Sequence, residues 1–271
     1  MAFFKTDDNV ELYYQVDGVG EKTVVLIHGW SAHHNFFENQ IKEFSKHYTV
    51  VSYDLRGHGQ SEISQDGYTI SRYAKDLKNL IDYLKLGKVN LVGWSMGTHI
   101  IFDFVKQFGN DGLESLVLID MSAKLITDDE YKHGLYSNYS HEDNLANLVI
   151  LNDNWSGFAE GFVPAIYATN KEVAPELLKW NLEEANKNST MVMTRMWIDM
   201  SAADYRDVLP LIKVPTLVTF GEQSALYSRA NSEYLAESIA DAECIGFENC
   251  GHGLMIEQPE LFNKIVSEFI G

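Results

Sequence analysis

Short apolar runs alternate with longer amphipathic segments along most of the chain. After two expected antiparallel strands near residues 2–6 and 10–17, buried runs follow at residues 24–27, 49–53, 89–92, 116–119, 216–220 and 243–247. Several of these runs are rich in Val, Ile and Leu, as is typical of strands that are buried on both faces. The pattern predicts an α/β fold, in which helices flank a mostly parallel sheet of eight strands.

The segments between these runs carry apolar residues at helical spacing. Helices are expected at residues 36–44, 70–86, 98–108, 231–239 and 259–270. In the second of these, apolar residues recur every three or four positions from Tyr73 to Leu84, and Gly87 is expected to end the helix.

The alternation breaks once, between residues 124 and 205, and this interval is rich in Tyr, Trp and Met. A loop of this length without secondary structure is uncommon in a compact domain. We therefore expect a helical lid at residues 124–205, inserted after the sixth strand, and a core made of residues 1–123 and 206–271. Most aromatic side chains of the lid are expected to form its own interior, and some are expected to face the cleft.

The charge balance bears on the partners of the protein. The chain has 271 residues, with 21 Lys and Arg against 39 Asp and Glu, which gives a formal net charge of −18. Such a charge repels phosphate backbones and anionic lipid headgroups, so we expect neither nucleic acid nor a membrane as partner. The sequence has no apolar run of about 18 residues and no basic, apolar leader at its start, from which we expect a cytoplasmic protein.

The potential metal ligands lack the spacing of known sites. Cys244 and Cys250 have no metal-ligand or redox spacing and are expected to be reduced thiols. His33 and His34 are adjacent but have no HExxH motif or carboxylate cluster beside them in the sequence. We expect no metal and no cofactor.

Ser95 lies in the segment Gly93-Trp94-Ser95-Met96-Gly97, between a predicted strand and a predicted helix. The bare Gly-x-Ser-x-Gly pattern is weak, since it arises by chance in roughly one chain in ten of this size. Its position makes it specific, because a very sharp strand-to-helix turn leaves little room beside the serine, so that glycines flank it and its hydroxyl stands clear of the sheet. Ser95 is therefore the candidate nucleophile.

Acyl transfer also needs donors for an oxyanion and a general base. The backbone N–H of Met96 follows the nucleophile, and Trp30 follows the first buried run in His28-Gly29-Trp30, so these two amides are the candidate oxyanion donors. His252 comes after the last expected strand and before the last helix, which makes it the candidate base. We expect His28 to orient its loop and interpret His58 as part of a structural turn.

Five segments, taken in order, resemble the α/β-hydrolase superfamily, on its branch of serine esterases and cofactor-free haloperoxidases. They are His28-Gly29-Trp30, Asp54-Leu55-Arg56-Gly57-His58-Gly59-Gln60-Ser61, the segment around Ser95, Leu116-Val117-Leu118-Ile119-Asp120 and Gly251-His252. The resemblance covers nearly the whole chain outside the lid. It is highly specific for the fold and less so for the chemistry, because the superfamily also hosts lactonases, C–C hydrolases and a few non-hydrolases.

The chain departs from the family pattern at the acid of the catalytic triad. In many relatives the strand that corresponds to residues 216–220 is followed by Gly-x-x-Asp, whereas Gly221-Glu222-Gln223-Ser224 has a serine at that place. Asp120 ends the preceding strand and resembles the acid of relatives in which it has moved there. We favour Asp120, and Glu222 is the alternative acid.

The leading hypothesis is a serine hydrolase that cleaves a small neutral carboxylic ester, thioester or lactone through an acyl-enzyme on Ser95. The expected lid has six basic residues against 13 acidic ones, so a carboxylate-bearing substrate would find few partners. One alternative is a cofactor-free ring-cleaving dioxygenase that uses a His252–Asp120 dyad, although Trp94 stands where a second His would be expected. Another is a ligand-binding or signalling protein with slow turnover. Ser95 excludes the dehalogenases and epoxide hydrolases, which need a carboxylate nucleophile.

Overall fold

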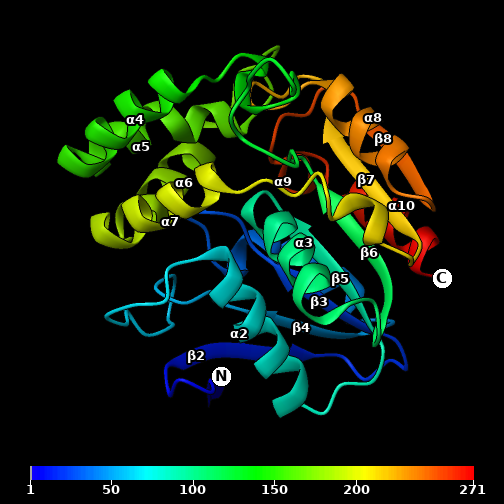
Figure 1. Ribbon diagram of the computed structural model, residues 1–271. Coiled ribbons are helices and arrows are strands. Elements are labelled where there is room, and N and C mark those ends of the chain that lie inside the picture. The colour runs from blue at the N-terminus through cyan, green and yellow to red at the C-terminus, as the bar shows by residue number, and fades with distance from the viewer. Residues whose placement is uncertain (1) are drawn as a thin grey trace.

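An eight-stranded sheet lies at the centre of this computed structural model, which describes residues 2–271 (Figure 1). Its strand order is β1-β2-β4-β3-β5-β6-β7-β8. Strand β2 pairs antiparallel with both β1 and β4, and the other neighbouring strands are parallel. The strands are β1 (Ala2–Lys5), β2 (Glu11–Asp17), β3 (Thr23–Ile27), β4 (Thr49–Tyr53), β5 (Val89–Trp94), β6 (Leu113–Ile119), β7 (Thr216–Gly221) and β8 (Ala242–Phe247). The predicted α/β architecture is confirmed.

The helices of the core pack against this sheet. They are α1 (Glu38–Phe44), α2 (Ile70–Tyr83), α3 (Met96–Phe108), α8 (Arg229–Ser238), α9 (Leu254–Glu257) and α10 (Pro259–Ile270). Helices α2 and α3 lie side by side in front of the sheet in Figure 1, and α1 packs against α10. Every residue of β3 and β5 is buried, as their apolar composition predicts.

One predicted helix end is wrong. Helix α2 ends at Tyr83 and not at Gly87. Lys85 adopts a φ of 53°, and the N–H of Leu86 donates to the carbonyl of Ile81 at 3.0 Å. A left-handed residue followed by this backward hydrogen bond is the usual C-terminal helix stop, here formed without glycine.

Four α-helices occupy the insertion between β6 and β7 and lie together above the sheet in Figure 1. They are α4 (His141–Asp153), α5 (Trp155–Phe162), α6 (Pro175–Asn186) and α7 (Thr190–Ala202). A β-bridge between Lys124 and Asp204 brings the two ends of the insertion together. We call residues 124–205 the cap and the remaining described residues the core. The division into core and lid stays a prediction.

Short 3-10 turns connect several of these elements. They are η1 (His34–Phe37) before α1, η2 (Leu135–Ser137) and η3 (Val163–Ile166) in the cap, and η4 (Leu209–Leu211) before β7. Over the part of the chain that the structure describes, no helix is both long enough and apolar enough to cross a membrane.

Candidate active site

Ser95 sits at the turn between β5 and α3, in a backbone conformation that side-chain-bearing residues rarely adopt. Its φ is 54° and its ψ is −122°, and its N–H donates to the carbonyl of Ile119 at 2.9 Å. It is partly exposed, whereas its neighbours Trp94 and Met96 are buried. The turn thus strains the backbone and holds the serine out of the sheet.

The two flanking glycines are required by space. A Cβ on Gly93 would lie 2.6 Å from the carbonyl oxygen of Gly97, and a Cβ on Gly97 would lie 2.3 Å from the carbonyl oxygen of Ile27. Neither position therefore admits a larger residue without a backbone shift.

The loop after β3 passes directly beside Ser95. A Cβ on Gly29 would come within 3.1 Å of the Cβ of Ser95. Between residues 2 and 271, no acceptor is hydrogen-bonded to the backbone N–H of Trp30 or of Met96. Both candidate oxyanion donors are therefore unengaged, and Met96 is the first residue of α3, where N–H groups have no partner within the helix.

His252 lies in the loop after β8 and is 1% exposed. Its ring lies 5.4 Å from that of Trp94, and its carbonyl accepts a hydrogen bond from the indole N–H of Trp94 at 2.8 Å. The Tyr227 ring lies 5.8 Å away. The imidazole is thus held beside the residue that precedes Ser95.

The structure brings Asp120, and not Glu222, to His252. Asp120 directly follows β6 with a φ of 43°, and its Oδ2 accepts a hydrogen bond from Nδ1 of His252 at 2.7 Å. Both side chains are buried. The Glu222 carboxylate instead forms an ion pair with Arg229. A Nδ1–H that donates to a carboxylate leaves Nε2 free to accept a proton, which is the tautomer a general base requires.

Ser224, at the place where many relatives carry the acid, donates its hydroxyl to Oδ2 of Asp120 at 2.8 Å. In the sequence this serine is only a departure from the family pattern, and the contact with Asp120 was not predicted. The spacing within the chain carries no signal for it, because Ser224 and Asp120 are 104 residues apart.

Three further buried histidines of the core, His28, His58 and His99, have structural hydrogen bonds. His28 accepts a hydrogen bond from the N–H of Leu55 at 2.9 Å through Nε2. This bond ties the loop after β3 to the loop after β4, which agrees with the expectation that His28 orients its loop. Nδ1 of His58 bonds to the carbonyl of Arg56 at 3.0 Å, and Nε2 of His99 bonds to the carbonyl of Ser122 at 2.8 Å. Burial lowers the pKa of His58 and of His99 to about 4.

The cysteines are free thiols. Burial raises the pKa of Cys244 to about 11 and that of Cys250 to about 12, so neither is a reactive thiolate near neutral pH.

Aromatic side chains of the cap surround Trp30. Its ring lies 5.2 Å from Trp155, 5.4 Å from Phe162 and 5.0 Å from Trp197, and its indole N–H donates to the carbonyl of Met193 at 3.1 Å. These contacts place an apolar, aromatic cluster of the cap against the loop that passes Ser95.

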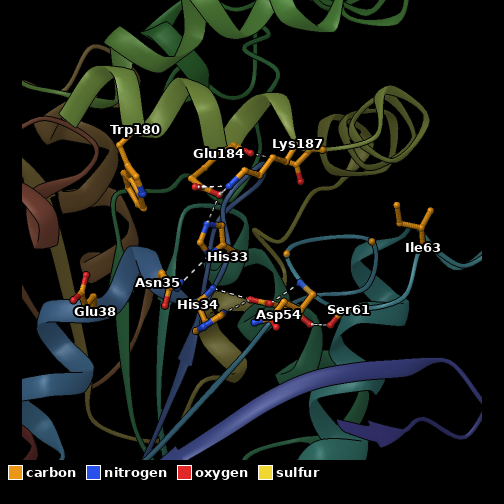
Figure 2. A pocket seen from close by; sticks show the side chains of 14 residues that line it. His33, His34, Asn35, Glu38, Asp54, Ser61, Ile63, Trp180, Glu184 and Lys187 are labelled. Atoms are coloured by element: carbon orange, nitrogen blue, oxygen red, sulfur yellow. Dashed lines mark hydrogen bonds and ion pairs between the residues drawn. The ribbon is translucent and has the colours of Figure 1, made fainter. Parts of the chain in front are cut away.

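A second contact between cap and core borders a cavity of about 530 Å³, which Figure 2 shows from close by. Glu184 on α6 faces His33 on the core loop, with 3.2 Å between its Oε2 and Nε2 of His33. Lys187 also reaches Glu184, at 2.7 Å. Burial lowers the pKa of His33, although the carboxylates of Asp54 and Glu184 act in the opposite direction.

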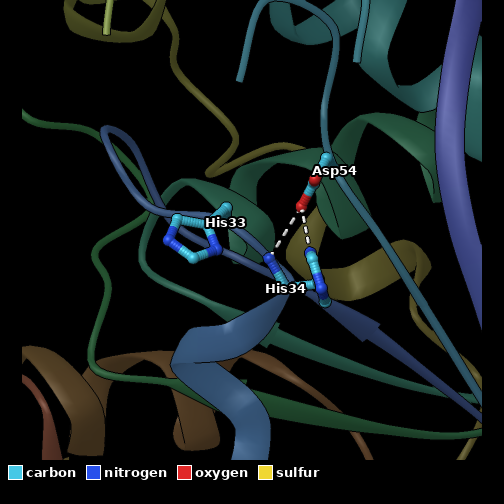
Figure 3. Close-up of side chains that lie close together, drawn as sticks. All are labelled: His33, His34 and Asp54. Carbon is cyan, nitrogen blue, oxygen red and sulfur yellow. Dashed lines mark hydrogen bonds and ion pairs between the residues drawn. The ribbon is translucent and has the colours of Figure 1, made fainter. Parts of the chain in front are cut away.

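His33, His34 and Asp54 are close enough to be considered as metal ligands, since one donor atom of each lies within 4.8 Å of the others (Figure 3). The spacing of these residues along the sequence does not indicate that Asp54 lies beside the two histidines. Both the backbone N–H and Nδ1 of His34 bond to Oδ1 of Asp54, at 2.8 and 2.7 Å, and the N–H of Gln60 bonds to Oδ2 at 2.8 Å.

These contacts decide whether the three side chains are free to bind a metal. Burial alone would raise the pKa of Asp54, but the hydrogen bonds from His34 and Gln60, together with the electrostatic effect of His34 and His28, outweigh it and lower the pKa. Nε2 of His33 meets Glu184, and its Nδ1 accepts the N–H of Asn35 at 3.3 Å. Because a metal needs free lone pairs aimed at one point, and these donors already hold the loops together, we assign no metal to the cluster.

The chain is similar to known proteins in both sequence and structure. The family described as alpha/beta hydrolase fold matches residues 22–259. The "AB hydrolase superfamily protein YisY" of Bacillus subtilis (strain 168) is 29% identical over 275 residues, which cover 98% of each chain. The "Bifunctional esterase/perhydrolase DCH" of Acinetobacter calcoaceticus is 27% identical over 280 residues, which cover 100% of this chain and 99% of that protein.

Among solved structures, an esterase (EaEST) from Exiguobacterium antarcticum is similar, with a TM-score of 0.92 and 26% identity over 99% of this chain and 98% of that one. The family match spans most of the chain, and the sheet order and the serine turn agree with it. The chain therefore belongs to the α/β-hydrolase superfamily, whose esterase and haloperoxidase-like members it resembles.

Proposed function

We propose that this protein is a serine hydrolase that cleaves a small neutral carboxylic ester, or a closely similar thioester or lactone, through an acyl-enzyme on Ser95. The esterase relatives support a hydrolase activity. The observation that carries the proposal is the 2.7 Å hydrogen bond between His252 and Asp120, on the loops that follow β8 and β6. This pair supplies the base and its orienting acid beside the strained serine turn.

The reaction runs in two halves. Nε2 of His252 takes the proton of the Ser95 hydroxyl as Oγ attacks the substrate carbonyl, and the Asp120 carboxylate stabilises the imidazolium that forms. The backbone N–H groups of Trp30 and Met96 hold the oxyanion. His252 then protonates the leaving alcohol, and a water molecule repeats the sequence on the acyl-enzyme, which releases the acid and regenerates Ser95.

The surroundings of the serine support a neutral, apolar substrate. The loop that carries Trp30 is covered by Trp155, Phe162 and Trp197 of the cap, which offer apolar area and few charges. The acidic balance of the cap, together with the net charge of −18, opposes the binding of a carboxylate-bearing substrate.

Two assays test the proposal. A fluorophosphonate probe should add to Ser95, as peptide mass spectrometry would show, and p-nitrophenyl esters of short acids should be turned over. The Ser95→Ala variant should lose both. Ser232→Ala is a matched control, because Ser232 is a buried serine of α8 whose hydroxyl has no hydrogen-bond partner in the described residues. Absence of any adduct on Ser95 would contradict the proposal. A stoichiometric burst without turnover would instead indicate the slow ligand-binding protein.

The His252–Asp120 dyad also favours a second candidate, a cofactor-free ring-cleaving dioxygenase. Against it, the indole of Trp94 lies beside His252, at the place where such an enzyme is expected to carry another histidine. Oxygen uptake with a hydroxyquinolone, in the absence of ester turnover, would favour this candidate over the esterase.

A further inference from the structure

Two donors from different elements share one oxygen of the candidate acid. Oδ2 of Asp120 accepts from Nδ1 of His252 at 2.7 Å and from the hydroxyl of Ser224 at 2.8 Å. Oδ1 of Asp120 is buried and has no hydrogen-bond partner among residues 2–271. The rotation of the carboxylate therefore depends on what holds Oδ2.

The direction of the Ser224 hydroxyl is set by its own surroundings. Its Oγ accepts weak hydrogen bonds from the backbone N–H groups of Leu226 and Tyr227, at 3.3 and 3.4 Å. A hydroxyl has one hydrogen and two lone pairs, so with both lone pairs facing N–H groups the hydrogen points to Asp120. Chains of hydrogen bonds of this kind reinforce each other.

The loop that carries Ser224 is itself held by its backbone. The N–H of Ser224 bonds to the carbonyl of Gly221 at 3.0 Å, and the N–H of Gln223 bonds to the carbonyl of Cys250 at 2.9 Å. Cys250 lies two residues before His252. The loop that carries Ser224 is thus hydrogen-bonded to the loop that carries His252.

We propose that Ser224 is a positioning residue, whose hydroxyl fixes the Asp120 carboxylate in the rotation that meets Nδ1 of His252. The inference rests on the proposed function and adds a residue to its machinery. Terminal carboxylate torsions have broad minima, so His252 alone restrains the carboxylate only loosely. A group that merely stabilised the turn would need only to accept the N–H groups of Leu226 and Tyr227.

Removal of the hydroxyl tests the proposal first. Ser224→Ala should lower kcat by about 10- to 100-fold with little change in KM, the size expected when a hydrogen bond to a charged group is lost. Ser224→Thr, which keeps a hydroxyl, should retain most of the activity, and Ser232→Ala should behave as wild type. Equal kcat values for Ser224→Ala and wild type would overturn the proposal.

An exchange of the two side chains tests it more sharply. Asp120→Ser should lower kcat by about 10³- to 10⁴-fold. In the double variant Asp120→Ser/Ser224→Asp, the carboxylate starts from position 224 and reaches one atom further than the serine hydroxyl did, into the space that Asp120 leaves. At least about 100-fold of the lost rate should return. Recovery would show that position 224 faces the same ring nitrogen of His252 as Asp120 does, which the proposal requires, and a folded double variant as inactive as Asp120→Ser would contradict that shared geometry.

A readout without turnover separates this inference from the proposed function. The Nδ1–H proton of His252, followed by NMR, should be protected from exchange in wild type and in the double variant, exchange faster in Ser224→Ala, and be lost in Asp120→Ser. If wild type neither labels at Ser95 nor hydrolyses esters, the proposed function fails, while these spectra still decide the part played by Ser224. If the Nδ1–H proton of His252 is as well protected in Ser224→Ala as in wild type, the proposed role of Ser224 is refuted. Thermal unfolding identifies any variant that does not fold, and the comparison of Ser224→Ala with Ser224→Thr then decides.

Discussion

The core holds its candidate catalytic residues through the backbone, whereas the cap is joined to the core mainly by side chains. Ser95 and Asp120 sit at the ends of buried parallel strands, and their N–H groups bond to the carbonyls of Ile119 and Thr219 at 2.9 and 2.8 Å. Cap and core meet mostly through side chains, among them the aromatic contacts of Trp30 and the hydrogen bond of His33 with Glu184, and through a few backbone hydrogen bonds such as that from the N–H of Tyr136 to the carbonyl of Leu226 at 2.8 Å.

Burial also differs between helix α4 of the cap and the central strands of the core. Helix α4 of the cap leaves Leu145 and Val149 more than half exposed, at 65% and 62%, whereas β3 and β5 of the core are buried throughout. Closely packed strands tolerate little displacement, while surface helices joined to the core mostly by side-chain contacts can be substituted more freely. Changes in the core should therefore act on the rate of reaction, and changes in the cap on substrate affinity.

The largest effect is expected from the acid. Asp120→Asn should lower kcat by about 10³- to 10⁴-fold, because an amide cannot stabilise the imidazolium or keep the required tautomer of His252. Glu222→Gln is the matched control and should leave kcat within about threefold of wild type, since surface ion pairs such as that with Arg229 contribute little. Steady-state kinetics on a p-nitrophenyl ester decides, and loss of activity in the Glu222 variant alone would show that the acid is assigned wrongly.

Acid should destabilise the core through its buried histidines. The pKa of His58 and of His99 is lowered by burial from 6.5 to about 4, so between these values the unfolded chain binds more protons than the folded one. Stability is then fully present above pH 6.5 and is lost as the pH falls towards 4. At pH 5 the loss should be about 2 kcal/mol for each histidine.

Urea unfolding at pH 7.5, 6 and 5 measures this loss. His99→Gln, which keeps an N–H donor for the carbonyl of Ser122, should make the dependence on pH shallower. A free energy of unfolding that stays constant from pH 7.5 to 5 would show that these histidines do not control acid stability.

The same substitution at one glycine of the core and one glycine of the cap compares the two regions directly. Gly97→Ala should cost about 1–3 kcal/mol of stability and lower kcat by about 100-fold, since its Cβ would lie 2.3 Å from the Ile27 carbonyl and displace the serine turn. A Cβ on Gly161, in α5 of the cap, would have no atom within 4 Å beyond its chain neighbours and the backbone of its own helix, and Gly161→Ala should stabilise the protein by about 0.5–1 kcal/mol. Thermal unfolding and steady-state kinetics on the two variants measure these changes. Equal effects of the two substitutions would contradict the difference between core and cap.

The smallest effect is expected where Glu184 of the cap contacts His33 of the core. Glu184→Gln should change KM by about threefold and leave kcat and stability nearly unchanged, because burial lowers the pKa of His33 and a glutamine carbonyl can still accept the hydrogen bond from its neutral imidazole. Its neighbour Glu183, which is exposed, supplies the control variant Glu183→Gln. A large change in kcat for Glu184→Gln would mean that this contact positions the site and does not merely join cap to core.

Part of the fold and of the site follows from local patterns. Runs of buried Val, Ile and Leu predict the strands, and the paired glycines around Ser95 predict the sharp turn, because both depend on residues adjacent in the chain. The end of α2 was missed, because a left-handed Lys85 leaves no compositional signal of the kind that glycine does.

The sequence by itself determined the α/β fold and singled out Ser95 and His252 as the chemistry-bearing pair, since the signal of each lies within a few neighbouring residues. Only the tertiary structure brought Asp120 and not Glu222 to His252, gave Ser224 a contact with that acid, and joined Asp54 to His34. The physical reason is that the contacts of Asp120 link residues more than 100 positions apart, which meet because β6, β7 and β8 are neighbours in the sheet. No spacing along the chain encodes that adjacency.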